Sequence, residues 1–107
     1  MRRVVIESPY SGQVKRNVAY ARAAMVDCLA RGEACIASHL LITQVYNDLD
    51  PEQRATGIAA GHAWIPVADA LVVYTDYGIS SGMAQGIAFA AQQEGVEIEY
   101  RKILEDT

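Results

Sequence analysis

Two carboxylates, Glu7 and Asp76, each end an apolar run of strand length. Carboxylates in such positions can act in general acid–base catalysis or accept hydrogen bonds from a nucleobase edge or from sugar hydroxyls. Hydroxyl, imidazole and aromatic groups follow the same runs or a neighbouring one: Ser8, Tyr10, His39, Thr43 and Tyr77. Tyrosine rings offer a flat, amphipathic surface to a planar ligand. These residue types predict a pocket for a ring-bearing small molecule.

The stretch from Asp69 to Gly86 has the pattern of a strand, a tight loop and a helix. In an open α/β sheet such a junction lies at the carboxyl edge, where ligands bind, and the new helix offers unpaired backbone N–H groups. Ser80 and Ser81 are candidates for the helix N-cap and, together with Gly82 and Met83, for ligand contacts. The alternative is an ordinary connection whose serine only caps the helix.

The remaining pattern supplies the elements that would position these groups. Apolar runs predict strands at 3–7, 34–39, 69–76 and 96–103, the second continuing into 40–43 with its boundary left open. Helical spacing predicts helices at 14–31, from 51 to about 65, and from 82 to about 93, and Asp50-Pro51 is a helix-start signal. The alternation predicts one α/β domain over 1–107: a three-layer, Rossmann/flavodoxin-like parallel sheet of about four strands with helices on both faces.

In that topology the polar residues converge on the carboxyl edge of the sheet. Ser11 and Asn17, near the first turn, join the predicted ligand contacts. His39 is equally compatible with a satisfied interior histidine. His62 is expected at the surface and Tyr74 in the core, while Asp69, at the opposite edge, is expected to serve as a cap or turn residue. The charged residues of 96–103 alternate with apolar ones, which predicts an edge strand with one face in water.

Composition narrows the class of protein. A net charge of −4 disfavours binding to polymeric nucleic acid, which requires a basic surface. No apolar run of about 18 residues or signal peptide is evident, so we expect a cytoplasmic protein without a membrane partner. Cys28 and Cys35 are expected to be reduced core thiols, and the scattered histidines and cysteines predict no metal site. No cofactor is predicted. Trp64 and Ile65 are adjacent and cannot share one core, so one of them is expected to contact another subunit.

Two segments resemble the nucleoside 2-deoxyribosyltransferase-like superfamily. The first is 5–32, which contains Val-Ile-Glu-Ser-Pro-Tyr-Ser-Gly and then Arg16-Asn17. The second is 68–83, which runs from a strand ending at Asp76 to Ser81-Gly82-Met83. The chain also resembles small members of this superfamily common in phage genomes. The resemblance implies a nucleoside or nucleotide ligand and a homo-oligomer in which the C-terminal segment lies near the partner's pocket.

The chain departs from this superfamily at the catalytic nucleophile. In the transferases a glutamate early in the third helix takes up the deoxyribosyl group, and the aligned position here is Ala84 or Gln85, neither of which can form that intermediate. The resemblance assigns Asp76 to protonation of the departing base, and Glu7 could activate water. Three functions stay open: a binding protein that sequesters or senses a nucleotide-derived ligand, an N-glycosidic hydrolase or transferase, and an assembly protein without a ligand. The missing glutamate favours the first.

Overall fold

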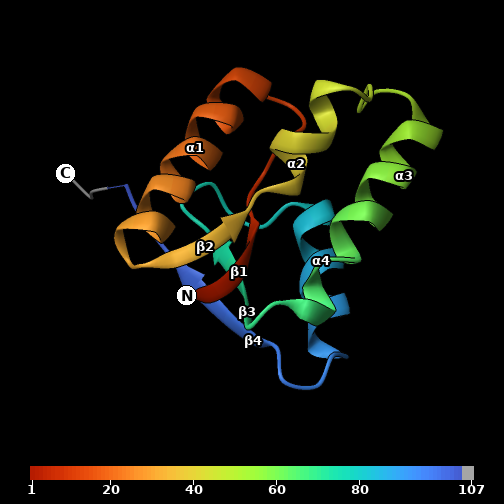
Figure 1. The fold of residues 1–107 in the computed structure, drawn as a ribbon. Helices are drawn as coiled ribbons and strands as arrows, with labels where there is room; N and C mark the ends of the chain where they lie inside the picture. Colours follow the sequence, from red (N-terminus) through yellow and green to blue (C-terminus); the bar gives the residue numbers. More distant parts are fainter. Residues whose placement is uncertain (105–107) are drawn as a thin grey trace.

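The computed structural model describes residues 1–104, within which a parallel sheet of four strands is flanked by helices on both faces (Figure 1). The strands are β1 (Arg2–Glu7), β2 (Glu33–Ile36), β3 (Ala70–Tyr74) and β4 (Glu97–Arg101), in the order β2-β1-β3-β4. The helices are α1 (Val14–Ala30), α2 (Ser38–Leu41), α3 (Pro51–His62) and α4 (Ser81–Ala91), with 3₁₀ turns η1 (Ile42–Gln44) and η2 (Ile65–Val67). The predicted α/β class and three-layer architecture are confirmed.

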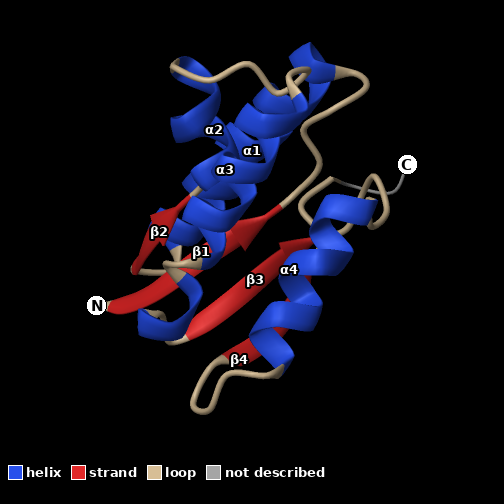
Figure 2. Ribbon diagram, turned by 90° about the vertical axis from the view of Figure 1, so that its right-hand side faces the viewer, coloured by secondary structure: helices blue, strands red, loops and turns tan. Residues whose placement is uncertain are grey.

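Alternation along the strands divides the core between the two faces of the sheet. Val4 and Ile6 of β1 pack with α1 on one face, and Val5 packs with α4 on the other. Figure 2 shows α4 lying along β3 and β4. All five residues of β3 are buried, as a strand covered on both faces requires, which explains its continuous apolar sequence. Tyr74 is fully buried, as predicted.

The helix starts follow the capping signals in the sequence. The Asp50 carboxylate accepts hydrogen bonds from the backbone N–H groups of Glu52 and Gln53, so it caps α3 in front of Pro51. Ser80 caps α4, since its hydroxyl accepts a hydrogen bond from the N–H of Met83 at 3.2 Å. At the opposite edge, Asp69 lies just before β3, and its carboxylate accepts a hydrogen bond from the N–H of Arg3 at 2.7 Å. This contact connects the start of β3 to β1 and fits the turn residue that the sequence predicts at this position. No helix within residues 1–104 is long and apolar enough to cross a membrane.

The second predicted strand is too long, and this expectation was wrong. β2 ends at Ile36, and the chain from Ser38 to Gln44 forms α2 and then η1. Here the Thr43 hydroxyl donates to the carbonyl oxygen of His39 at 2.6 Å, a hydrogen bond between residues four apart. A short apolar run does not distinguish a strand from a helix turn by periodicity. His39 therefore lies on a helix beyond the strand end.

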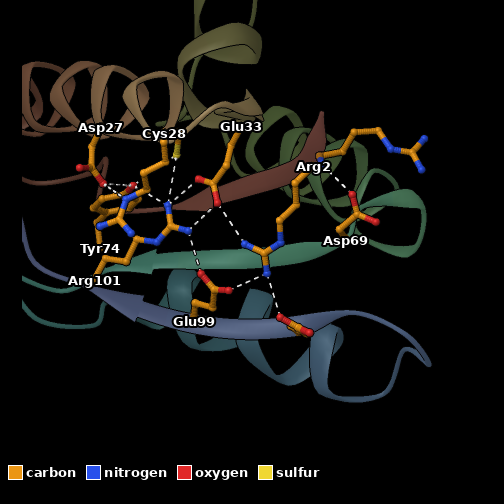
Figure 3. Close-up of polar contacts among 11 residues, drawn as sticks. Arg2, Asp27, Cys28, Glu33, Asp69, Tyr74, Glu99 and Arg101 are labelled. Carbon is orange, nitrogen blue, oxygen red and sulfur yellow. Dashed lines mark hydrogen bonds and ion pairs between the residues drawn. The ribbon is translucent and has the colours of Figure 1, made fainter.

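β4 is an edge strand, as predicted, and Glu97 is exposed, but the charged face of β4 is not simply open to water, because its residues form a network across the sheet (Figure 3). Arg101 is buried and donates to Glu33 of β2 through both terminal guanidinium nitrogens, Nη1 at 2.7 Å and Nη2 at 2.8 Å, and through Nη2 to Glu99 at 2.7 Å. Arg2 joins from β1, with contacts of 3.0 Å to Glu33 and 2.6 Å to Glu99. Hydrogen bonds from Arg101 lower the pKa of Glu33 to about 2. This network links β4 to β1 and β2.

Removal of the Arg101 charge should destabilise the fold strongly. Arg101→Gln leaves the buried Glu33 carboxylate without its main partner, so we expect a loss of about 3–5 kcal/mol in urea unfolding at pH 7. Arg31→Gln is the control, because it breaks a half-exposed pair with Asp27 and should cost less than about 1 kcal/mol. Similar losses in both variants would contradict a structural role for the network.

The same network predicts acid sensitivity. The pKa of Glu33 is lowered in the folded protein, so its pairing stabilises the fold fully above the unfolded value near 4.5 and is lost as the pH falls toward about 2.

Candidate functional site

A cavity of about 100 Å³ lies at the carboxyl edge of the sheet, between the end of β1, the α2–η1 segment, α3 and the start of α4. This is the edge at which open α/β sheets hold ligands. The lining brings together most of the predicted contact residues: Glu7, Ser8, Tyr10, Ser11, His39, Thr43, Ser80, Gly82 and Met83. Apolar walls are added by Val5, Ile42 and Ile58. Convergent polar groups on apolar walls are typical of a small-molecule site.

Glu7 ends β1 beside Val73 of β3 and lines the cavity. Its carboxyl makes no hydrogen bond or ion pair with any residue in the described part of the chain. Burial therefore raises the pKa of Glu7 to about 8, with no partner to lower it. At pH 7 the group is mainly protonated, so it can both donate and accept a hydrogen bond. Glu7 is only partly buried, and a partly buried titratable group that lines a cavity and has no partner among residues 1–104 is a strong candidate for a ligand contact.

Gly86 of α4 provides the space that Glu7 occupies. A Cβ atom added at position 86 would overlap the Oε2 atom of Glu7 and would lie 2.8 Å from its carboxyl carbon and 3.4 Å from its Cγ. Any side chain at 86 would thus displace the carboxyl. Ala84 and Gln85 are exposed, whereas Met83 and Gly86 are buried on the opposite side of α4. The sequence offered no signal for this pairing, because it joins residues 79 positions apart.

Ser8 and His39 form a hydrogen-bonded pair at the cavity wall. The Ser8 Oγ lies 2.7 Å from the His39 Nε2, and the Ser8 residue is only 5% exposed. Burial lowers the pKa of His39 to about 4, so the imidazole is neutral at pH 7. A neutral imidazole nitrogen can accept the proton of a serine hydroxyl or of a water molecule. Sequence reasoning selected both residues, but the misplaced strand boundary hid their contact.

α3 contributes groups that sequence reasoning missed. Arg54 lines the cavity, and its Nη1 lies 2.6 Å from the Oδ2 of Asp48, which also lines it. His62 was expected at the surface, but it lines the cavity and stacks on Phe89 with ring centroids 5.0 Å apart. A Cβ at Gly57 would lie 3.1 Å from the Cγ2 methyl of Ile42, so this glycine allows α3 to pack closely against η1.

Asp76 does not line the cavity and has a different set of contacts. Its carboxylate accepts hydrogen bonds from the Tyr20 hydroxyl at 2.6 Å and from the N–H groups of Ile103 and Leu104 at 2.8 and 3.1 Å. Burial acts to raise the pKa of Asp76, but these hydrogen bonds outweigh it and lower the pKa. Asp76 is therefore an ionised anchor for the chain after β4.

Three further predicted contacts also lie outside the cavity lining. Asn17 is buried, and its amide donates to the carbonyl oxygens of Tyr10 and Ser11, at 2.9 and 3.2 Å, so it shapes the turn that presents those residues. Tyr77 packs against Tyr20 and beneath the guanidinium of Arg16. Ser81 is an exposed first-turn residue of α4.

Comparison with known proteins gives a family. Residues 2–101 match the family model described as "Domain of unknown function (DUF7768)". The chain belongs to the DUF7768 family. The match spans all four strands and every cavity-lining residue, so the cavity lies within the DUF7768 domain. No curated protein and no solved structure matches the chain.

A double-mutant cycle between positions 7 and 86 tests the central geometry of this DUF7768 site. With Glu7 present, Gly86→Ala should destabilise by about 1–3 kcal/mol through overpacking. With Glu7→Ala, the same change should be neutral or stabilising, because alanine exceeds glycine in helix propensity by up to about 1 kcal/mol. Urea unfolding at pH 6 measures all four proteins.

Gly82→Ala is the matched control, since its Cβ would meet only the Arg54 Nη2 at an ordinary 3.8 Å. The effect of Gly82→Ala should not depend on Glu7. If the effects of Glu7→Ala and Gly86→Ala simply add, the two positions do not compete for one space.

Proposed function

We propose that this protein binds a nucleoside or nucleotide in the cavity at the carboxyl edge, with the planar ring seated against Glu7. The observation that carries the proposal is the position of the Glu7 carboxyl, which lines the cavity beside Gly86 and has no hydrogen-bond partner within residues 1–104. Its raised pKa, which leaves it mainly protonated at pH 7, supports the proposal. A neutral carboxylic acid held in an apolar site can donate a hydrogen bond to a ligand, a use that buried acids have in other sites. It also offers a carbonyl acceptor, so it complements a nucleobase edge that carries a neighbouring acceptor and donor.

The size and walls of the cavity support a ring-shaped ligand group. Its volume of about 100 Å³ compares with about 150 Å³ for an apolar cavity that accommodates benzene. Ile42, Ile58 and Met83 supply apolar contact, and Tyr10 supplies an amphipathic ring. The enclosed volume thus has room for no more than one ring, and the remainder of the ligand would extend toward the mouth of the cavity.

The charge state of the site favours binding over glycosyl transfer. Within residues 1–104, the cavity is lined by two carboxyls, Glu7 and Asp48. Glu7 is mainly protonated at pH 7, and Asp48 is paired with Arg54. Neither offers the free carboxylate that a covalent glycosyl intermediate requires. A binding role that sequesters or senses a nucleotide-derived ligand needs no such group.

N-glycosidic hydrolysis is the second candidate, and the Ser8–His39 pair favours it. The protonated Glu7 could donate its proton to the departing base, while the neutral His39 could accept a proton from attacking water. Both groups line the same cavity. Asp76 is not assigned a part, because its contacts lie elsewhere.

Ligand binding should stabilise the protein and depend on Glu7. We would screen nucleosides, nucleoside mono- and diphosphates, NAD, ADP-ribose and cyclic nucleotides by thermal shift, where a ligand at a hundred times its Kd adds about 2.7 kcal/mol. The affinity for a ligand identified in this screen should fall as the pH rises through about 8, the pKa of Glu7 in the protein without ligand. Glu7→Gln should remove this pH dependence, because its amide does not titrate.

Asp76→Asn is the control, since it removes a carboxylate outside the cavity and should leave affinity unchanged. Chromatography of the incubated ligand separates the two candidates: an intact ligand supports binding, and released base supports hydrolysis. A panel without any stabilising ligand, or a ligand whose affinity is the same in Glu7→Ala, would contradict the proposed site.

A further inference from the structure

The cavity contains a cationic end as well as a carboxyl end. Arg54 is the one lysine or arginine that lines it in the part of the chain from 1 to 104. Its side chain is 35% exposed, so the guanidinium lies at the border between the cavity and solvent. Glu7 and Ser8 enter the same cavity from the end of β1, whereas Arg54 enters from α3. The two ends are therefore borne by different elements.

Most of the hydrogen-bonding capacity of Arg54 is unused. A guanidinium has five N–H donors, and within the described residues the side chain of Arg54 makes one hydrogen bond, from Nη1 to the Oδ2 of Asp48 at 2.6 Å. Its Nη2 approaches the Gly82 position of α4, where a Cβ would lie 3.8 Å away. Gly82 itself lines the cavity, so the Nη2 of Arg54 lies beside a part of the lining that carries no side chain. The planar fork of arginine is suited to bidentate contact with phosphate oxygens.

We propose that the ligand of this cavity carries a phosphate group that binds Arg54 in place of Asp48. The inference rests on the proposed function and narrows its ligand class from nucleosides and nucleotides to nucleotides. Asp48 is 22% exposed, and such partly exposed ion pairs contribute little to stability. A phosphate with close to two negative charges at pH 7 can therefore displace the Asp48 carboxylate into water. In the protein without ligand, Asp48 neutralises the charge of the Arg54 guanidinium.

The surrounding charges make Arg54 the determinant of this preference. The chain has a net charge of −4, so long-range attraction does not favour an anionic ligand. At the cavity, Glu7 is mainly protonated and His39 is neutral. His62 also lines the cavity, and burial lowers its pKa, so it too is mainly neutral at pH 7. Within the described lining, the full charges at pH 7 are therefore those of Arg54 and Asp48. Selectivity for phosphate would come from the direct contact with Arg54.

Matched ligand pairs test the inference. Calorimetry would compare adenosine, guanosine, cytidine, uridine and thymidine with their 5′-monophosphates. We expect a monophosphate to bind at least tenfold tighter than its own nucleoside, as a charge-assisted hydrogen bond allows. Arg54→Gln should reduce this ratio to within about twofold, and Asp48→Asn should increase it. The ratio should also fall with added salt.

Arg22→Gln is the matched control, because it removes an exposed arginine of α1 that does not line the cavity; the ratio should not change. Arg54→Lys retains the charge without the planar guanidinium, so it should give an intermediate affinity ratio. This second variant keeps the inference testable if Arg54→Gln does not fold. Equal affinities for nucleoside and monophosphate, or a ratio that is unchanged in Arg54→Gln, would overturn the phosphate assignment. In that case, binding of the nucleosides would still support the proposed function. If no member of any pair binds, both proposals fail.

Discussion

The site depends on one steric relation: the carboxyl of Glu7 occupies the space that Gly86 leaves empty. β1 places Glu7 at the carboxyl edge of the sheet, and α4, which packs on one face of the sheet, presents Gly86 to its carboxyl. Because the carboxyl is largely removed from water there and has no partner within residues 1–104, its pKa rises and it is mainly protonated at neutral pH. A larger residue at 86 would expel the group, and a cation beside it would ionise it. The chemistry proposed for the cavity follows from this placement.

The other elements place neutral groups and one ion pair around that acid. Ser8 and His39 contact each other because α2 begins directly after the short strand β2. α3 closes the opposite wall, and its glycines allow it to approach η1 and Ser38. Asn17 holds the turn after β1, so Tyr10 and Ser11 are presented to the cavity. Residues that do not touch the cavity still determine its shape.

The fold and part of the site could be predicted from the sequence. The alternation of apolar runs with helical spacing was sufficient for a parallel sheet with helices on both faces, and that topology brought Glu7, Ser8 and His39 to one edge. Local signals were also reliable where a cap defines a boundary, as Asp50 and Ser80 show. The start of the predicted strand at 34–39 was right, but its end was placed too late because strand and helix are both compatible with so short an apolar stretch.

Side-chain direction and long-range partners could not be predicted. Asp76 ends a strand at the expected edge, yet its carboxylate turns to Tyr20 and the backbone after β4. Arg101 looked solvent-facing by alternation, but carboxylates from β2 and β4 allow it to be buried. Neither partner is encoded by a local pattern. The space at Gly86 is likewise visible only once β1 and α4 are placed together.

The most direct test of this account is an NMR titration of the Glu7 side-chain carboxyl carbon in uniformly ¹³C-labelled protein, with Glu7→Gln to assign the signal. We expect a single titration with a pKa near 8, well above that of an exposed glutamate. A midpoint near 4.5 would show that the carboxyl is solvated or paired, and would contradict a protonated Glu7 as the ligand-binding group.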